Sequence, residues 1–149
     1  MKIINEMDIT FDAVSINESF ARSTVAAFCL QANPTIDDIT DIKTAVSEAV
    51  TNSVVHAYPF GKGKINIKVK LLENSAIIEV SDFGIGIENF EKAREPFYTT
   101  KPNEERSGMG FTVMESFMDS LILTKNGKSG LTVKMEKSFN KTAPAIVGE

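Results

Sequence analysis

The stretch SEAVTNSVVHAY, from Ser47 to Tyr58, decides how this sequence folds and where its chemistry lies. Glu48, Asn52 and His56 recur every four residues, and the positions between them are mostly apolar or small. Residues four apart on an ideal α-helix are offset by only about 40°. The stretch therefore predicts a helix that packs its apolar side on a sheet and carries a row of polar side chains along the border of that buried side.

The segments on either side of this helix alternate between strand and helix patterns. The expected elements are a strand over 3–11, a helix over 17–32 capped by Ser15 with Glu18 three residues later, a helix over 36–57 capped by Thr35 with Asp37 and Asp38 in its first turn, a hairpin of strands over 64–73 and 76–83, a helix over 108–119 and a closing hairpin over 120–137. This order predicts an α/β fold, a two-layer sandwich in which helices cover one face of a mixed, mostly antiparallel sheet.

The chain length is that of one domain. Residues 1–137 are expected to form that domain, and residues 138–149, which are small and polar, a flexible tail. Residues 84–107 show no sustained period, and a connection of this length inside a domain is often a functional lid.

Composition excludes several classes of protein. The 149 residues are 42% hydrophobic and 24% charged, with a net charge of −4 and no basic run, so direct nucleic-acid binding is not expected. No stretch approaches the roughly 20 apolar residues of a membrane span, and no secretory signal is evident. Cys29 is the single cysteine, which leaves no disulfide framework, and it lies in an apolar run where burial is expected. These features predict a cytoplasmic protein.

Two glycine-containing motifs extend the chemistry of the polar row. Asp82 ends a predicted strand and is followed by Gly84 and Gly86, where bare backbone can approach a ligand ring while the acid accepts a hydrogen bond. Gly108 and Gly110 open a predicted helix, whose N-terminal N–H groups favour phosphate. Each motif also has an ordinary interpretation: a half-solvated helix edge, an Asx turn, and a flexible loop before a helix.

In this order, the three motifs resemble the nucleotide-binding fold shared by DNA gyrase, Hsp90, histidine kinases and MutL. Within that superfamily the chain most resembles the anti-sigma F family of small protein-serine kinases from endospore-forming bacteria. The resemblance is carried by NESFARSTVAAF, EAVTNSVVHAY, FYTTKPNEERSGMGF and VMESFMD and covers all but the last dozen residues. It implies a Bergerat-type ATP-binding fold with ATP and Mg²⁺ as cofactors.

The resemblance also implies roles for individual residues. Glu48 corresponds to the general base that orients or deprotonates the attacking hydroxyl, Asn52 to the Mg²⁺ ligand, and Asp82 to the acid that reads adenine. The remaining nucleotide-binding positions are Gly84 and Gly86 in the base pocket, Thr99, Thr100 and Lys101 where the lid meets the phosphates, Arg106, Ser107, Gly108, Met109 and Gly110 in the second glycine box, and Thr132 in the closing hairpin. His56 either supports the contact between helix and lid or is a structural histidine.

The closing hairpin departs from the family pattern. Relatives place a Thr directly after the hairpin glycine to help hold adenine, whereas here Leu131 follows Gly130 and Thr132 comes one residue later. Because side chains alternate along a strand, Thr132 should point away from the adenine site unless a bulge shifts the register. The loss of one hydrogen bond would then cost about 1–2 kcal/mol of affinity.

The resemblance further implies the partners. The face of the first helix that carries Glu18 and Arg22 would contact both a sigma factor and the anti-anti-sigma protein that competes for it, and the N-terminal region would build a homodimer. The expected activity is transfer of phosphate from ATP to a serine of the anti-anti-sigma protein. Two alternatives are a non-catalytic module whose sigma binding depends on ATP, and the catalytic domain of a histidine kinase.

Overall fold

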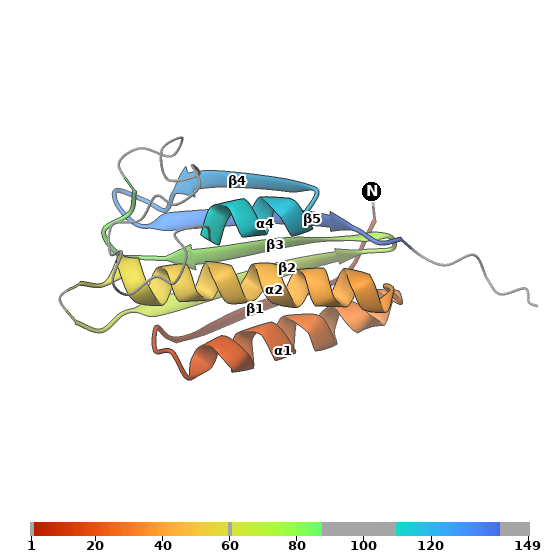
Figure 1. Cartoon of the computed structure of the whole chain (residues 1–149), viewed down its shortest axis with the longest axis horizontal. Helices are drawn as coiled ribbons and strands as arrows, with labels where there is room; N and C mark the ends of the chain where they lie inside the picture. Colours follow the sequence, from red (N-terminus) through yellow and green to blue (C-terminus); the bar gives the residue numbers. More distant parts are fainter. Residues whose placement is uncertain (1, 60, 88–109, 141–149) are drawn as a thin grey trace, which may run out of the picture.

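One antiparallel sheet, covered on a single face by helices, forms the protein (Figure 1). The computed structural model describes residues 2–59, 61–87 and 110–140. The strands are β1 (Ile3–Asp12), β2 (Lys64–Leu72), β3 (Ser75–Asp82), β4 (Ser120–Lys125) and β5 (Leu131–Ser138), in the order β1-β2-β3-β5-β4. The predicted α/β two-layer sandwich is confirmed. All neighbouring pairs of described strands are antiparallel, so the sheet is not mixed in this part of the chain.

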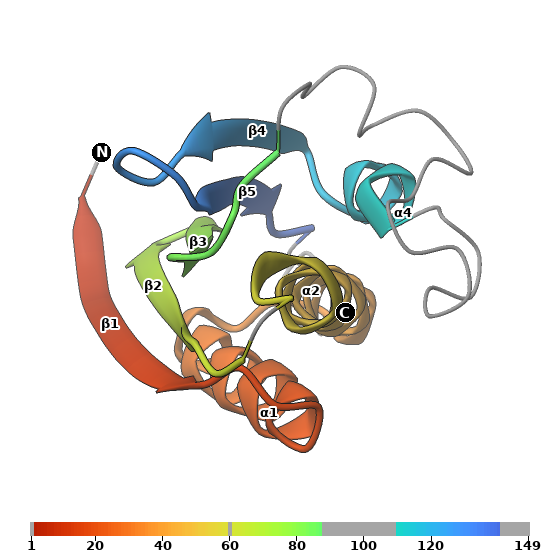
Figure 2. The same ribbon diagram turned by 90° about the vertical axis from the view of Figure 1, so that its left-hand side faces the viewer.

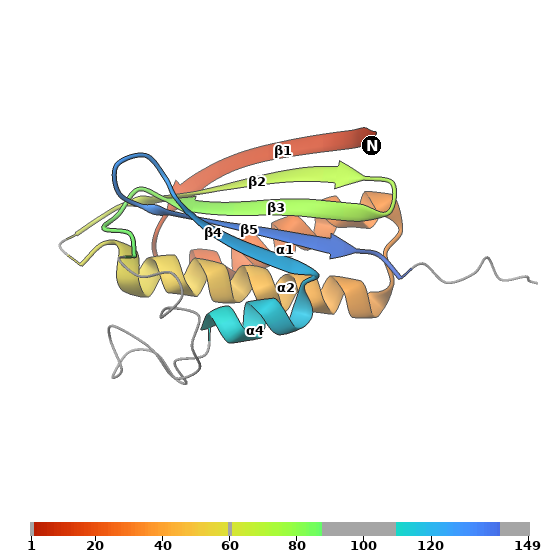
Figure 3. The ribbon, with the colours of Figure 1, turned by 90° about the horizontal axis from the view of Figure 1, so that it is seen from above.

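The helices pack side by side on the inner face of the sheet, and α2 lies between α1 and α4 (Figure 2). They are α1 (Asn17–Cys29), which continues as a 3₁₀ turn η1 (Leu30–Ala32), α2 (Ile36–Asn52), which continues as a π-helical turn η2 (Ser53–Ala57), and α4 (Gly110–Phe117). The view from above shows the sheet and the helices as two separate layers (Figure 3).

The sequence of α2 explains both its start and its position. Thr35 accepts a hydrogen bond from the Asp38 N–H, which confirms the predicted Thr35 cap, and the Asp38 carboxylate accepts one from the Thr35 N–H, which makes the cap a capping box. Further along, Ile42 and Val46 are fully buried. Burial of each of these side chains contributes about 1.5–3 kcal/mol to folding. The cap and the apolar stripe together hold α2 in the middle of the helical layer.

The inner face of the sheet is apolar except at two opposite ends. Its buried positions alternate along the strands: Ile65, Ile67, Val69 and Leu71 on β2, Ala76, Ile78, Val80 and Asp82 on β3, Leu121 and Leu123 on β4, and Leu131, Val133, Met135 and Lys137 on β5. Since β3 and β5 are antiparallel, the same alternation buries Asp82 at one end of the face and Lys137 at the other.

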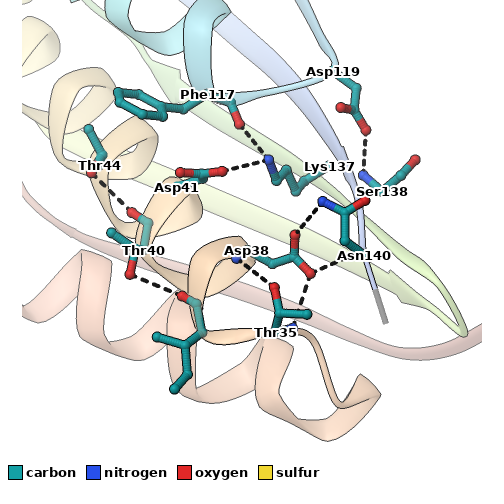
Figure 4. Close-up of polar contacts among 11 residues, drawn as sticks. Thr35, Asp38, Thr40, Asp41, Thr44, Phe117, Asp119, Lys137, Ser138 and Asn140 are labelled. Carbon is teal, nitrogen blue, oxygen red and sulfur yellow. Dashed lines mark hydrogen bonds and ion pairs between the residues drawn. The ribbon is translucent and has the colours of Figure 1, made fainter. Parts of the chain in front are cut away.

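Lys137 is bound by partners from two helices (Figure 4). Its ammonium donates to Asp41 Oδ2 of α2 at 2.8 Å and to the Phe117 carbonyl at the end of α4 at 2.9 Å. A cation near the last carbonyls of a helix also complements the helix dipole. The pair therefore ties α4, α2 and β5 together at one end of the molecule.

Several boundaries of the helices differ from the sequence predictions. The N-cap of α1 is Ile16 without a side-chain hydrogen bond, so the prediction that Ser15 caps this helix is wrong; Ser15 offers only its backbone oxygen, to the Glu18 N–H at 3.2 Å. The helix expected over 36–57 changes to π-helical geometry at Ser53.

The predicted tail begins too early. Residues 138–140 belong to the folded part, because Phe139 is 8% exposed and the Asn140 N–H donates to Asp38 Oδ2 at 2.9 Å. Residues 88–107 of the predicted lid, residues 108 and 109 of the following helix and residues 141–149 of the tail lie outside the described residues. In the part of the chain that is described, no helix has both the length and the apolar character needed to cross a bilayer.

Candidate functional site

At the end of the sheet where β3 stops, the side chain of Asp82 accepts three hydrogen bonds. Its residue is 2% exposed. Oδ1 accepts from the N–H groups of Gly84 and Leu131, both at 3.1 Å, and Oδ2 accepts from the Ser53 hydroxyl at 3.1 Å. A carboxylate offers about four acceptor positions. The contacts with described residues fill three of them and leave one on Oδ2.

The environment of Asp82 sets its protonation. Burial raises the pKa of this carboxyl above the usual 3.8, and the hydrogen bonds from Gly84, Ser53 and Leu131 lower it in part. Burial has the larger effect because it removes the charged form from water. The result is a desolvated acceptor of fixed direction, which gains more from an added donor than an exposed carboxylate would.

The turn after Asp82 lies directly against the end of the helix. The Ile85 N–H donates to the Ala57 carbonyl at 2.9 Å. A Cβ at Gly84 would overlap this carbonyl, so only glycine allows the turn to approach η2 so closely. The glycine that the sequence assigned to a base pocket thus brings the backbone of that pocket against η2.

The polar row of α2 leads into this region. Glu48 and Asn52 are half-buried, Asn52 is the last residue of α2, and Ser53, the next residue, holds Asp82. His56 lies in η2 and is half-buried. The structure therefore brings the amide of Asn52 and the carboxylate of Asp82 to the same end of the molecule, with Glu48 one helical turn behind.

The first residue of α4 faces the same end. Because Lys137 joins the last residue of α4 to Asp41 near the start of α2, the two helices run in opposite directions, and Gly110 lies toward the end of α2 (Figures 1 and 3). The other candidates near the phosphates, Thr99, Thr100, Lys101, Arg106, Ser107, Gly108 and Met109, lie outside the described residues.

Thr132 is not part of this site. Its hydroxyl is 2.7 Å from that of Ser81, on the face of the sheet opposite Asp82, so it points away as the alternation of the strand predicted. Leu131 takes part through its backbone N–H, while its side chain is 2% exposed. The departure from the family pattern therefore removes a hydroxyl from the site but keeps a backbone donor to Asp82.

Three contributing side chains were not identified from the sequence. Ser53 holds Asp82, Asn126 donates from Nδ2 to the Asp82 carbonyl at 2.7 Å, and the Tyr58 hydroxyl accepts from the Phe83 N–H at 2.7 Å. A signal existed for Ser53, because a hydroxyl on an otherwise apolar helical arc requires a buried partner. Nothing in the spacing of Tyr58 or Asn126 pointed to this turn.

Glu18 and Arg22 lie on α1, which begins at the end of the molecule where η2 stops (Figure 1). Glu18 Oε2 and Arg22 Nη1 are 2.6 Å apart, and the side chains of Arg22 and Glu18 are 36% and 28% exposed. The pair is thus positioned by the helix itself and is accessible from solvent.

Known proteins resemble the chain over nearly its whole length. Residues 12–137 match the family model of the histidine kinase-like ATPase domain. The anti-sigma F factor of Bacillus licheniformis is 50% identical over 139 residues, which cover 93% of this chain and 95% of the relative. The anti-sigma F factors of Clostridium botulinum and Clostridium kluyveri are 52% and 53% identical, each over 91% of this chain and 96% of the relative.

A crystal structure of the RsbU and RsbW domains of Rv1364c from Mycobacterium tuberculosis is similar in fold, with a TM-score of 0.63 and 20% identity over 91% of this chain and 32% of that one. At this identity the likeness concerns the fold alone. The identities above 50% and the matched domain do more, and the chain therefore belongs to the anti-sigma F factor family and contains a histidine kinase-like ATPase domain.

Proposed function

We propose that this protein binds ATP with Mg²⁺, sequesters a sigma factor and phosphorylates a serine of the anti-anti-sigma protein that opposes this sequestration. The observation that carries the proposal is the geometry of Asp82: a buried carboxylate, fixed by three donors, with one acceptor position left on Oδ2. That position suits the amino group of adenine, which donates, and not the carbonyl of guanine, which accepts.

The residues around Asp82 fit an adenine nucleotide. Gly84 lets the turn after Asp82 lie directly against Ala57 of η2, and Asn52 offers a neutral oxygen, a ligand that hard cations such as Mg²⁺ accept. ATP supplies the phosphoryl group, and Mg²⁺ offsets its charge. Asp82 would orient the base, Asn52 would hold the metal, and Glu48 would orient the attacking hydroxyl and take its proton. The N–H groups at the start of α4 would face the phosphates.

The partners follow from the names of the relatives, which are anti-sigma F factors. The partner-binding face would be that of Glu18 and Arg22, since α1 begins at the same end of the molecule as the site. A homodimer built through the N-terminal region belongs to the same proposal. So does a cytoplasmic location, where the transcription machinery lies.

The test uses ATP labelled in the γ-phosphate, the full chain and a purified anti-anti-sigma protein. Acid-stable label on a serine of that protein supports the proposal. Acid-labile label would instead indicate histidine-kinase chemistry, and ATP-dependent sigma binding without label would indicate a non-catalytic module.

The Glu48→Ala variant identifies the base in the same assay. We expect the transfer rate to fall by about 10²-fold or more while ATP binding stays nearly unchanged. Glu79→Ala is the matched control, because Glu79 is also a half-buried acid but lies on the opposite face of the sheet from the buried Val80 that follows it. Its neighbours on the adjacent strands are Lys68 of β2 and Lys134 of β5. Transfer by Glu48→Ala at the parental rate would refute the role of this residue.

A further inference from the structure

The peptide group between Asp82 and Phe83 is held by side chains at both of its polar ends. The Asp82 carbonyl accepts from Asn126 Nδ2 at 2.7 Å, and the Phe83 N–H donates to the Tyr58 hydroxyl at 2.7 Å. A buried backbone group needs a partner from the backbone, a side chain or water. Here two side chains from distant parts of the chain fix the plane of the peptide that follows the adenine-reading acid.

Tyr58 is fixed by its own contacts. It directly follows η2, and its hydroxyl donates to the Lys64 carbonyl at the start of β2 at 2.5 Å while it accepts from the Phe83 N–H just after β3. A Cβ at Gly63 would overlap the Tyr58 ring, so the ring lies in space that only glycine leaves open. One hydroxyl thus joins the helix end, the first residue of β2 and the turn after β3.

The direction of the Asp82 side chain depends on this peptide. Rotation of the 82–83 peptide plane would move the Gly84 N–H, which donates to Oδ1, and would change the angle at which Oδ2 meets Ser53. The side chain of Phe83 is 58% exposed and gives the turn little anchorage in the core. The Tyr58 hydroxyl is therefore, beside Asn126, one of two side-chain contacts that hold this peptide and with it the direction of the free acceptor position of Asp82.

We infer that Tyr58 is a positioning residue for recognition of the adenine amino group, a role that rests on the ATP binding proposed above. Tyr58 does not touch the base. It holds the Phe83 N–H, the Phe83 peptide fixes Asp82, and Asp82 accepts from the amino group. Phenylalanine keeps the ring but can neither accept from the Phe83 N–H nor donate to the Lys64 carbonyl, so Tyr58→Phe removes these two hydrogen bonds and leaves the packing of the ring.

A cycle with two nucleotides separates this role from a general loss of stability. ATP and purine riboside 5′-triphosphate, which lacks the 6-amino group, are titrated by calorimetry with the parental protein and with Tyr58→Phe. We expect the parental protein to bind ATP about tenfold more tightly than the analogue. The variant should lose most of this preference, whereas a purely structural defect would weaken both nucleotides by the same factor.

Two further variants make the result decisive. Ser81→Ala removes a hydroxyl contact one residue from Asp82 on the opposite face and should keep the parental preference. Gly63→Ala keeps the Tyr58 hydroxyl but displaces its ring, and should reproduce the loss if Tyr58→Phe does not fold. In the nucleotide-free Tyr58→Phe protein, hydrogen exchange at the Phe83 amide should accelerate while exchange at Ile78, in the middle of β3, stays unchanged.

The outcomes separate the role of Tyr58 from the proposed ATP binding. If the parental protein prefers ATP and Tyr58→Phe and Gly63→Ala keep the full preference, the role of Tyr58 is refuted and the proposed function stands. If the parental protein does not discriminate between the two nucleotides, the assignment of Asp82 is refuted, and the role of Tyr58 with it.

Discussion

At the scale of single residues, the burial of Asp82 and the role proposed for it oppose each other. Its burial disfavours the charged form, yet recognition of a donor needs a charged or at least accepting oxygen. Such tension is typical of functional sites, because a group selected only for stability would be apolar or solvated.

Asp82→Asn tests this opposition. Because the pKa of Asp82 is raised in the folded state, the folded protein keeps a proton that the unfolded chain loses, and the parental free energy of unfolding falls as the pH rises from 3.8 through the raised value. The variant has no such titration, and its free energy of unfolding should stay within about 1 kcal/mol of the parental value at neutral pH. Urea denaturation at several pH values measures this.

The same variant should lose nucleotide binding, since the Asn amide presents a donor or a weaker acceptor to adenine. Parental affinity for ATP in a folded Asp82→Asn protein would show that this residue does not read the base. Asp119→Asn, at an exposed acid that accepts from the Ser138 N–H, serves as the control.

The residues of the site were predictable where the sequence pattern is local. The spacing of Glu48 and Asn52 and the glycines that follow Asp82 predicted that these residues share one site, and the structure brings them to the same end of the sheet. Tyr58 and Asn126 were not predictable, because their partners at Phe83 and Asp82 lie 25 and 44 residues away along the chain. Such contacts depend on how strands are registered, which no short stretch of sequence specifies.

At the scale of elements, the inner face of the sheet carries a buried charge at each end. Asp82 is satisfied by the site, and Lys137 by Asp41 and the Phe117 carbonyl (Figure 4). The alternation of Leu131, Val133 and Met135 could have placed Lys137 inward from sequence. Its partners could not be inferred, since they come from two helices that the strand pattern does not position.

Lys137→Met tests the contribution of this contact. It leaves the Phe117 carbonyl and Asp41 without the ammonium, and Asp41 is 26% exposed, so water can replace part of the loss. We expect the free energy of unfolding to fall by about 1–3 kcal/mol. Lys134→Met, at a half-buried position on the other face of β5, should change it by less than about 0.5 kcal/mol. If both variants lower the free energy of unfolding in urea by the same amount, the hydrogen bonds of Lys137 do not stabilise the fold.

The helices and strands were predicted correctly where the hydrophobic period is strong. Details at the ends of helices were not predicted. The strands and the Thr35 cap of α2 match the prediction. The cap of α1 and the π-helical turn η2 do not, because Ile16 already has helical dihedral angles and because η2 forms where Ser53 contacts the last residue of β3 and Ala57 contacts the turn after it. π-Helical turns of this kind are frequent at functional sites.

At the scale of the whole molecule, the reactivity of Cys29 shows whether α1 separates from the rest of the fold. It is fully buried, and burial raises the pKa of its thiol to about 12. Because the thiolate is the reactive form, an aromatic disulfide reagent should not label the native protein at pH 8, and labelling should follow unfolding in urea. Rapid stoichiometric labelling without denaturant would show that α1 detaches from the sheet under native conditions.

The central claim is that residues from η2, the turn after β3 and the start of α4 converge on one adenine nucleotide. Hydrogen exchange with and without Mg²⁺ and ATP tests it across the whole chain, with Asp82→Asn as the control. The account predicts ATP-dependent protection at residues 53–57, at 82–87 and at the first turn of α4, and none of it with GTP or in the variant. Protection that is absent from these three segments, or equal for ATP and GTP, would contradict it.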